Sequence, residues 1–138
     1  MKDTILHTPK TLSFSQDIVK YLPPGIRRRL PAEIGIVLVS EKESQRFNRR
    51  YRKKYRPANV LSFAYGKEYG EIIVCPSLIR REAREQNHSF EYQLTRMVLH
   101  GMIHLGGVHH ENSKLTAKRF LKAEEHVLKR VMSLNHES

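Results

Sequence analysis

Cysteine is almost absent from this sequence, and its scarcity excludes two kinds of stabilisation. Cys75 is the only cysteine among 138 residues. A structural zinc site made of four cysteines and a disulfide framework within one chain are therefore both excluded. A metal site in this protein has to be built from other residue types.

Long apolar segments are also missing. No apolar run approaches the roughly 18 residues needed to span a bilayer, and the segment from Met1 to Pro9 lacks the apolar stretch of a secretory signal. We therefore expect a cytoplasmic protein without a membrane anchor. The chain has no internal repeat and no linker rich in Pro, Gly or Ser, so we expect a single domain over residues 1–138.

Acidic residues are few relative to basic ones. Lys and Arg total 25 and Asp and Glu total 14, which gives a net charge of +11. This excess favours binding to a polyanion such as RNA. The charge is concentrated around Tyr51 and Tyr55, whose rings offer faces on which unpaired bases can stack. The candidate RNA-binding residues are Arg49, Arg50, Arg52, Lys53, Lys54 and Arg56. A solvated, solubilising helix face is the alternative explanation of this cluster.

Four of the eight histidines fall between residues 100 and 110, and three of them have the spacing of a metal site. His100 and His104 are four residues apart, so on an α-helix they project from the same face. Gly107 and His110 complete the pattern H-x-x-x-H-x-x-G-x-x-H, in which the glycine lets the chain leave the helix through a positive-φ turn. The pattern predicts a metzincin-like site for one zinc ion per chain, with three histidine ligands and an open fourth position. Nickel, cobalt and copper also bind histidines of this kind.

The residue after the first histidine helps to distinguish a peptidase from an enzyme that hydrolyses phosphodiesters. Zinc peptidases with this pattern carry a glutamate there, which moves a proton to the leaving amine. Here the position is Gly101, which counts against peptidase activity. Hydrolysis of a phosphodiester is less demanding, because a metal ion and an arginine can stabilise its developing charge.

Apolar periodicity and turn residues predict strands and helices mixed along the chain. Ser40 and Glu43 form a capping box, and residues 66–70 are short enough for a hairpin loop. In the histidine helix Leu94, Val98 and Met102 recur every four residues as one core stripe. The predicted helices are residues 17–22, 40–52, 76–87, 90–105 and 114–134 with a short turn at 27–30, and the predicted strands are residues 33–39, 59–65 and 71–75. Alternation in the first strand places Ile34, Ile36 and Leu38 on one face.

Three further segments accompany the histidine motif. They are Asn48-x-x-Tyr51-Arg52-x-Lys54, Val60-Leu61-Ser62-Phe63 and Gly70-Glu71-Ile72-Ile73-Val74-Cys75. Together with the histidines they resemble the YbeY family of single-domain bacterial endoribonucleases, from about residue 33 to the end of the chain. The family usually has aspartate at the position of Glu71, and Tyr-Asp where this chain has Val108-His109.

The resemblance implies an α+β fold in which a small mixed β-sheet packs against helices, with the zinc-binding helix at its centre. It implies a metal-dependent endoribonuclease that prefers single strands and acts in ribosomal RNA maturation and ribosome quality control, with the small ribosomal subunit as a partner. By the same resemblance His100, His104 and His110 would be the zinc ligands. His100 and Arg52 would be the catalytic residues, and Arg52 suits the role because a guanidinium keeps its charge and can bind two phosphate oxygens.

Two other functions stay open from the residues alone. One is a zinc metallopeptidase or other metallohydrolase, against which Gly101 argues. The other is a non-catalytic RNA-binding ribosome-assembly factor whose metal is structural, which the altered residues Val108 and His109 favour. Glu111, beside the third histidine, is a candidate substitute for the missing aspartate.

Overall fold

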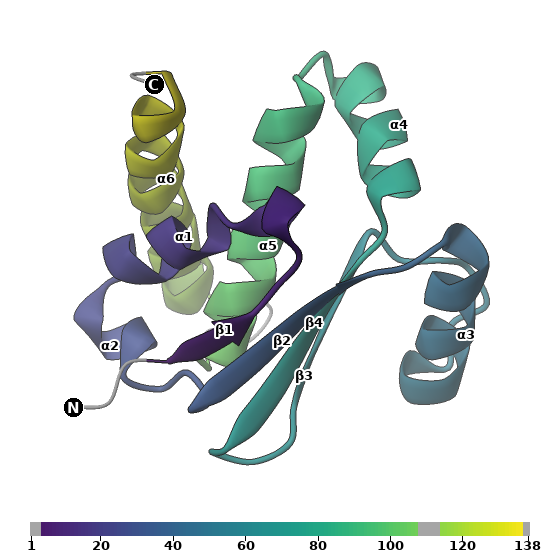
Figure 1. Cartoon of the computed structure of the whole chain (residues 1–138), viewed down its shortest axis with the longest axis horizontal. Helices are drawn as coiled ribbons and strands as arrows, with labels where there is room; N and C mark the ends of the chain where they lie inside the picture. Colours follow the sequence, from purple (N-terminus) through teal and green to yellow (C-terminus); the bar gives the residue numbers. More distant parts are fainter. Residues whose placement is uncertain (1–3, 108–113, 137–138) are drawn as a thin grey trace.

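A computed structural model describes residues 4–107 and 114–136 of the chain (Figure 1). In this part of the chain a four-stranded mixed sheet is combined with six α-helices, which confirms the predicted α+β class. The element bounds are β1 Ile5–His7, the 3₁₀ turn Lys10–Leu12, α1 Ser15–Tyr21, α2 Pro24–Arg27, β2 Glu33–Leu38, α3 Glu41–Arg52, β3 Val60–Ala64, β4 Tyr69–Val74, α4 Pro76–Gln86, α5 Phe90–Leu105 and α6 Lys114–His136.

The sheet has the strand order β1-β2-β4-β3. The first three of these strands are parallel, and β3 pairs with β4 in the antiparallel direction as the predicted hairpin. The register places Leu61 opposite Ile73 and Ser62 opposite Ile72. Strand β3 is therefore one edge of the sheet, at the side where the candidate catalytic residues gather.

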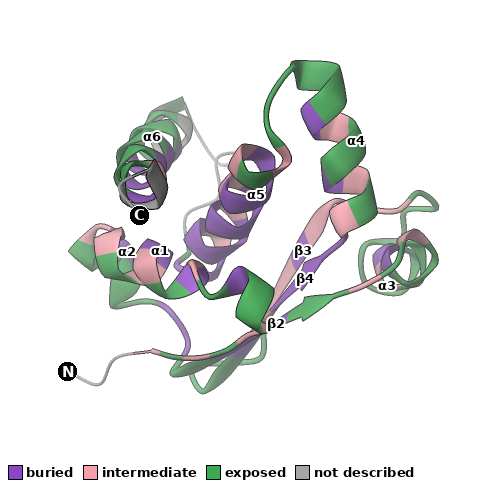
Figure 2. Ribbon diagram, turned by 45° about the horizontal axis from the view of Figure 1, so that its top comes forward, coloured by how far each residue is buried: buried purple, intermediate pink, exposed green. Residues whose placement is uncertain are grey.

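Helix α5 lies across one face of the sheet, and its apolar side chains form the centre of the core. Figure 1 shows α5 between the sheet and α6, and Figure 2 shows that much of α5 is buried. The predicted stripe of Leu94, Val98 and Met102 is confirmed, since these side chains are buried against the sheet and the neighbouring helices. Helix α5 also packs against α4, α1 and α6. The histidine helix is thus held on several sides.

Helix α3 begins and ends as its sequence predicts. The Ser40 hydroxyl accepts a hydrogen bond from the Glu43 amide at 3.1 Å, and the Glu43 carboxylate accepts one from the Ser40 amide at 3.1 Å. Its C-cap Lys53 is in the left-handed region, with φ 56°. The chain therefore turns sharply after Arg52, the last residue of the helix.

Removing the N-cap hydroxyl of α3 should destabilise the protein. For Ser40→Ala we expect the free energy of unfolding to fall by about 1 kcal/mol, because the Glu43 amide in the first turn loses its hydrogen-bond acceptor. Urea unfolding of both proteins measures the difference. Ser133→Ala, at an exposed position in α6, is the control and should leave the midpoint unchanged; an equal loss in both variants would contradict the capping role.

Two details of the sequence prediction are corrected by the structure. The helical turn expected at residues 27–30 is α2, Pro24–Arg27, which begins earlier because a proline favours the first turn of a helix. Leu38 was placed on one face with Ile34 and Ile36, but those two side chains are buried whereas Leu38 is 42% exposed. It lies at the end of β2 beside a hollow of about 620 Å³ that Phe14 also lines, so the space over it is unfilled.

Strand β1 was not predicted. It has only three residues, and its pairing with β2 joins segments far apart in the chain. No helix in the described ranges is both long and apolar enough to cross a membrane.

Candidate active site

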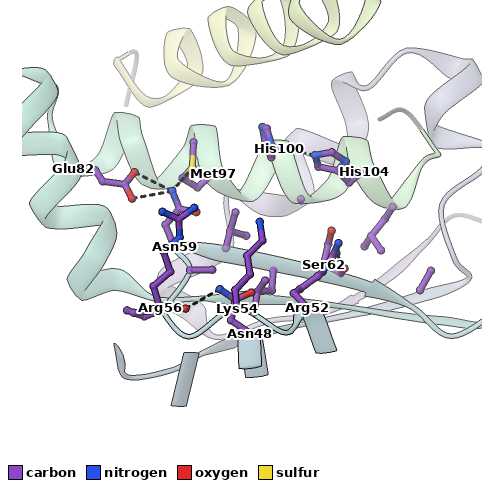
Figure 3. Close-up of a pocket in the computed structure, with 17 residues that line it drawn as sticks. Asn48, Arg52, Lys54, Arg56, Asn59, Ser62, Glu82, Met97, His100 and His104 are labelled. Carbon is purple, nitrogen blue, oxygen red and sulfur yellow. Dashed lines mark hydrogen bonds between the residues drawn. The ribbon is translucent and has the colours of Figure 1, made fainter. Parts of the chain in front are cut away.

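The histidine face of α5 lines an open cleft of about 760 Å³. The opposite wall consists of the end of α3, the loop that follows it and the edge strand β3 (Figure 3). Polar and charged side chains from these elements and from α4 reach the cleft: Asn48, Arg52, Lys54, Arg56, Asn59, Ser62, Glu82, His100 and His104.

His100 and His104 meet as the helical spacing predicts. Their Nε2 atoms lie 3.0 Å apart, and both side chains are half-buried on the cleft wall. The ring of Phe120 from α6 contacts both imidazoles, with centroid distances of 4.8 Å and 5.3 Å. Two imidazole nitrogens this close repel each other unless a proton or a cation lies between them. The two imidazole nitrogens are thus positioned to bind one cation together.

The histidine pair fits a transition metal ion. A Zn–N bond is about 2.0–2.1 Å long, so one ion can reach two nitrogens that are 3.0 Å apart. The third predicted ligand, His110, lies outside the described residues, as do Val108, His109 and Glu111. Within the described ranges no group of three or more His, Cys, Asp or Glu side chains is arranged to hold a metal. The described chain therefore contains two of the three predicted ligands, and the complete metzincin-like motif is not seen.

The turn that follows the histidine helix has the predicted conformation. Gly107, the glycine of the histidine pattern, has φ +85°, a region that L side chains rarely adopt. The Gly107 amide donates to the His104 carbonyl at 2.9 Å, which closes the end of α5. The special backbone expected at this position is confirmed.

Gly101 lies where α5 packs against strand β4. A Cβ atom placed at this position would stand 3.1 Å from Cγ2 of Ile72 on β4. The glycine is buried and lets α5 settle onto the strand. The position that carries the glutamate of zinc peptidases is therefore used here for packing.

Arg52 extends from the end of α3 into the cleft. Its Nη2 donates to the carbonyl oxygen of Ser62 at 3.3 Å, and its guanidinium lies 5.7 Å from the centroid of the Phe63 ring. Both contacts come from the edge strand β3. The structure thus brings Arg52 to the same cleft as His100 and His104.

Buried polar contacts fix the loop after α3. Nδ2 of Asn48 donates to the Arg56 carbonyl at 2.7 Å, and the Ser44 hydroxyl donates to the Ala58 carbonyl at 2.6 Å. Asn48 is 4% exposed and Ser44 is 1% exposed, so these hydrogen bonds are shielded from water. Because the loop is held against α3, Lys54 and Arg56 line the cleft.

The remaining members of the basic cluster point elsewhere. Arg49 lies over the ring of Tyr55 and Arg50 lies over the ring of Tyr51, at 5.4 Å and 5.5 Å from the centroids. Neither residue lines the cleft, and neither does the C-cap residue Lys53. The cluster predicted from sequence therefore divides into a cleft group, Arg52, Lys54 and Arg56, and an outer group, Arg49, Arg50 and Lys53.

Cys75 is excluded as a reactive group. Its side chain is fully buried, and burial raises the pKa of its thiol. Because the thiolate is the nucleophilic form, a raised pKa keeps the group neutral and inert at pH 7 to 8. We expect a disulfide exchange reagent to label one thiol per chain in denaturant and none in the native protein over the same time. Rapid labelling of the native protein would contradict this assignment.

Sequence reasoning missed one part of the cleft. Nδ2 of Asn59 donates to both carboxylate oxygens of Glu82, at 3.0 Å and 2.9 Å, and contacts Sδ of Met97 at 3.1 Å (Figure 3). These residues come from the position just before β3, from α4 and from α5. No periodic pattern or motif joins such distant positions, although Asn59 directly precedes the segment Val60-Leu61-Ser62-Phe63.

Comparison with known proteins decides the family. The sequence model of the family described as Endoribonuclease YbeY matches residues 2–132. The chain belongs to the YbeY family. The resemblance drawn from its motifs is thereby confirmed.

Individual YbeY relatives agree with this assignment. Endoribonuclease YbeY of Thermotoga maritima is 40% identical over 97 residues, which cover 68% of this chain and 65% of the relative. This match therefore spans slightly less than two thirds of the relative's length. Endoribonuclease YbeY of Thermotoga petrophila is 30% identical over 130 residues, covering 92% of this chain and 87% of the relative. The relative of the same name from Aquifex aeolicus is 33% identical over 105 residues, covering 72% and 70%.

A solved structure extends the YbeY comparison to three dimensions. A protein of Thermotoga maritima, whose structure was determined in solution, superposes with a TM-score of 0.63 and 31% sequence identity. The superposition covers 98% of this chain and 95% of the other. The sheet and the helices around it are therefore shared along nearly the whole length.

Proposed function

We propose that this member of the YbeY family is a single-domain, zinc-dependent endoribonuclease that cleaves flexible, single-stranded regions of ribosomal RNA. Its family makes it a hydrolase of RNA phosphodiester bonds. The observation that carries the proposal is the approach of two imidazole nitrogens to 3.0 Å on the wall of a cleft that Arg52, Lys54 and Arg56 also line. Ribosomal RNA maturation in the cytoplasm, on the small ribosomal subunit, is the setting that we propose for this activity.

The basic residues of the cleft would bind the RNA backbone. The Arg52 guanidinium can bind two oxygens of the scissile phosphate, because its donors form a planar fork. Lys54 and Arg56 would bind neighbouring phosphates, and these contacts carry no sequence information. Since the cleft is open, a flexible strand can enter it without melting a long duplex.

The metal would be held by His100 and His104, with His110 proposed as the third ligand. When bound, it would supply Lewis-acid chemistry, lowering the pKa of a water molecule and offsetting negative charge at the phosphate. The protein contributes a preorganised pair of donors, because α5 is packed on several sides and Phe120 contacts both rings.

The two alternatives are less well supported. A peptidase would need a carboxylate at position 101, and here a glycine packs against Ile72. A non-catalytic assembly factor does not agree with a family named for its endoribonuclease activity. It makes a distinct prediction, namely a stoichiometric metal without cleavage.

Loss of one histidine should abolish metal binding and cleavage together. We expect near one zinc per chain in the wild type by mass spectrometry, with cleavage of a single-stranded RNA, and loss of both in His104→Ala. The control is His126→Ala, at an exposed position in α6, which should keep both properties. Full metal content without cleavage in the wild type would favour the assembly factor. Cleavage that persists in metal-free His104→Ala would overturn the proposed site.

A further inference from the structure

The cleft has two chemically different ends. His100, His104 and Arg52 lie toward one end, whereas Glu82, Asn59 and Met97 lie together at the other (Figure 3). Glu82 is the one carboxylate among the described residues that line the cleft. A carboxylate repels phosphate, so binding of the RNA backbone does not account for it.

Glu82 is held in place by two side-chain amides. Asn59 Nδ2 donates to both carboxylate oxygens, at 3.0 Å and 2.9 Å, and Gln93 Nε2 lies 3.4 Å from Oε2. Gln93 is 1% exposed, and its Oε1 is buried without a partner among the described residues. A buried oxygen without a hydrogen bond costs about 1–3 kcal/mol. Gln93 thus helps to orient the carboxylate with its Nε2, while its unpaired Oε1 lowers the stability of the fold.

The arrangement leaves hydrogen-bond acceptors at this end of the cleft. A carboxylate accepts up to about four hydrogen bonds, and the two amides occupy one site on Oε1 and two on Oε2. Nδ2 of Asn59 already donates to Glu82 and Met97. The side-chain atom of Asn59 that remains available is Oδ1, which is also an acceptor. A ligand that binds here must therefore donate hydrogen bonds.

Nucleobases with an exocyclic amino group meet this requirement. Cytosine, adenine and guanine each present an N–H₂ group, and a carboxylate is a usual acceptor for the amino group of cytosine. Uracil presents two carbonyl oxygens with a single N–H between them. Met97 and Val60 line the same cleft and offer apolar contacts to a base. Unpaired bases in single-stranded RNA are read through such edges.

We propose that Glu82 and Asn59 form a base-reading subsite that accepts a nucleobase with an amino group and disfavours uracil. This inference rests on the proposed endoribonuclease function and adds a sequence preference to it. The cleft volume of about 760 Å³ accommodates a nucleotide that extends to this subsite from the end of the cleft that contains Arg52.

Binding of mononucleotides tests the subsite without requiring cleavage. We would titrate the zinc-loaded protein with CMP, AMP, GMP and UMP and follow the side-chain amide signals of Asn59 by NMR. All four carry the same phosphate, so a difference in affinity reports the base. We expect UMP to bind roughly five- to tenfold more weakly than CMP, the size of one good base contact, and to leave the Asn59 signals unshifted.

A variant that alters the acceptor should change the preference. Glu82→Gln keeps the shape of the side chain but adds a donor, so we expect the ratio of CMP to UMP affinity to fall to about one. The matched control is Glu85→Gln, at an exposed position on the same helix, which should keep the wild-type ratio. Equal affinities of the four nucleotides for the wild type, or an unchanged ratio in Glu82→Gln, would overturn the subsite.

Cleavage measured in parallel separates the two proposals. RNA cleavage with equal nucleotide affinities would reject the subsite and leave the endoribonuclease intact. Discrimination against UMP in a wild-type protein that cleaves no RNA would reject the nuclease and support the subsite as a base-binding site. Cleavage 5′ or 3′ of amino-bearing bases, lost in Glu82→Gln but kept in Glu85→Gln, would support both.

Discussion

Replacing Arg52 with alanine is expected to lower the single-turnover rate of RNA cleavage by about 100- to 1000-fold, the usual effect of removing one group that stabilises charge in a transition state. The guanidinium donates to the Ser62 carbonyl and lies against Phe63, so it is already oriented in the cleft before substrate binds. Because Arg52 is exposed, the free energy of unfolding should change by no more than about 0.5 kcal/mol.

Two further variants show whether charge or geometry is lost. Arg49→Ala removes an equal charge from the same helix, outside the cleft, and should reduce the affinity for RNA without a large change in the cleavage rate. Arg52→Lys keeps the charge but loses the planar fork, so we expect a partial recovery. If Arg49→Ala and Arg52→Ala slowed cleavage equally, Arg52 would be one more surface cation rather than a catalytic residue.

Placing glutamate at Gly101 should destabilise the protein strongly. We expect Gly101→Glu to lower the free energy of unfolding by about 3 kcal/mol, since overpacking and a buried carboxylate both cost energy. The new Cβ would stand 3.1 Å from the Ile72 side chain, within the contact between α5 and β4. The better helix propensity of glutamate returns at most about 1 kcal/mol of this.

A second glycine provides the control. Gly25 lies in a helix and is exposed, and a Cβ placed there meets nothing within 4 Å. Gly25→Glu should therefore change the stability by no more than about 0.5 kcal/mol. Thermal and urea unfolding of both variants give the comparison. Peptidase activity on casein in Gly101→Glu, with an unchanged unfolding midpoint, would contradict the packing role of this glycine.

The sequence predicts best those elements whose signals are local. Helix α5 has the predicted bounds because Ser89 caps its start, with the hydroxyl accepting from the Tyr92 amide at 3.0 Å, and a glycine pair follows its end. The capping box of α3 and the hairpin of β3 and β4 depend on neighbouring residues in the same way. Strand β1 depends instead on a distant partner, and three residues carry too little periodicity to reveal it.

In the candidate site, too, the sequence predicts local features but not contacts between distant residues. The meeting of His100 and His104 follows from their spacing on one helix, and the positive φ of Gly107 follows from its place after that helix. The pairing of Asn59 with Glu82 joins the residue before β3 to a helix residue 23 positions later, and only the tertiary fold brings the two together. Asn48 and Ser44 hold the loop after α3 and so determine which basic residues reach the cleft. The pattern of charges in the sequence does not predict this.

The order of elements along the chain determines when the site can form during synthesis. All four strands lie between Ile5 and Val74, whereas the histidine helix begins at Phe90. A ribosome that has released the sheet has not yet released the helix that covers it, so Ile34, Ile36 and Ile72 stay uncovered for at least that interval. The nascent protein therefore passes through a stage with an exposed apolar sheet and no metal-binding histidines. The helix that covers the sheet also carries the metal-binding histidines, so a chain interrupted before α5 lacks both a closed core and an active site.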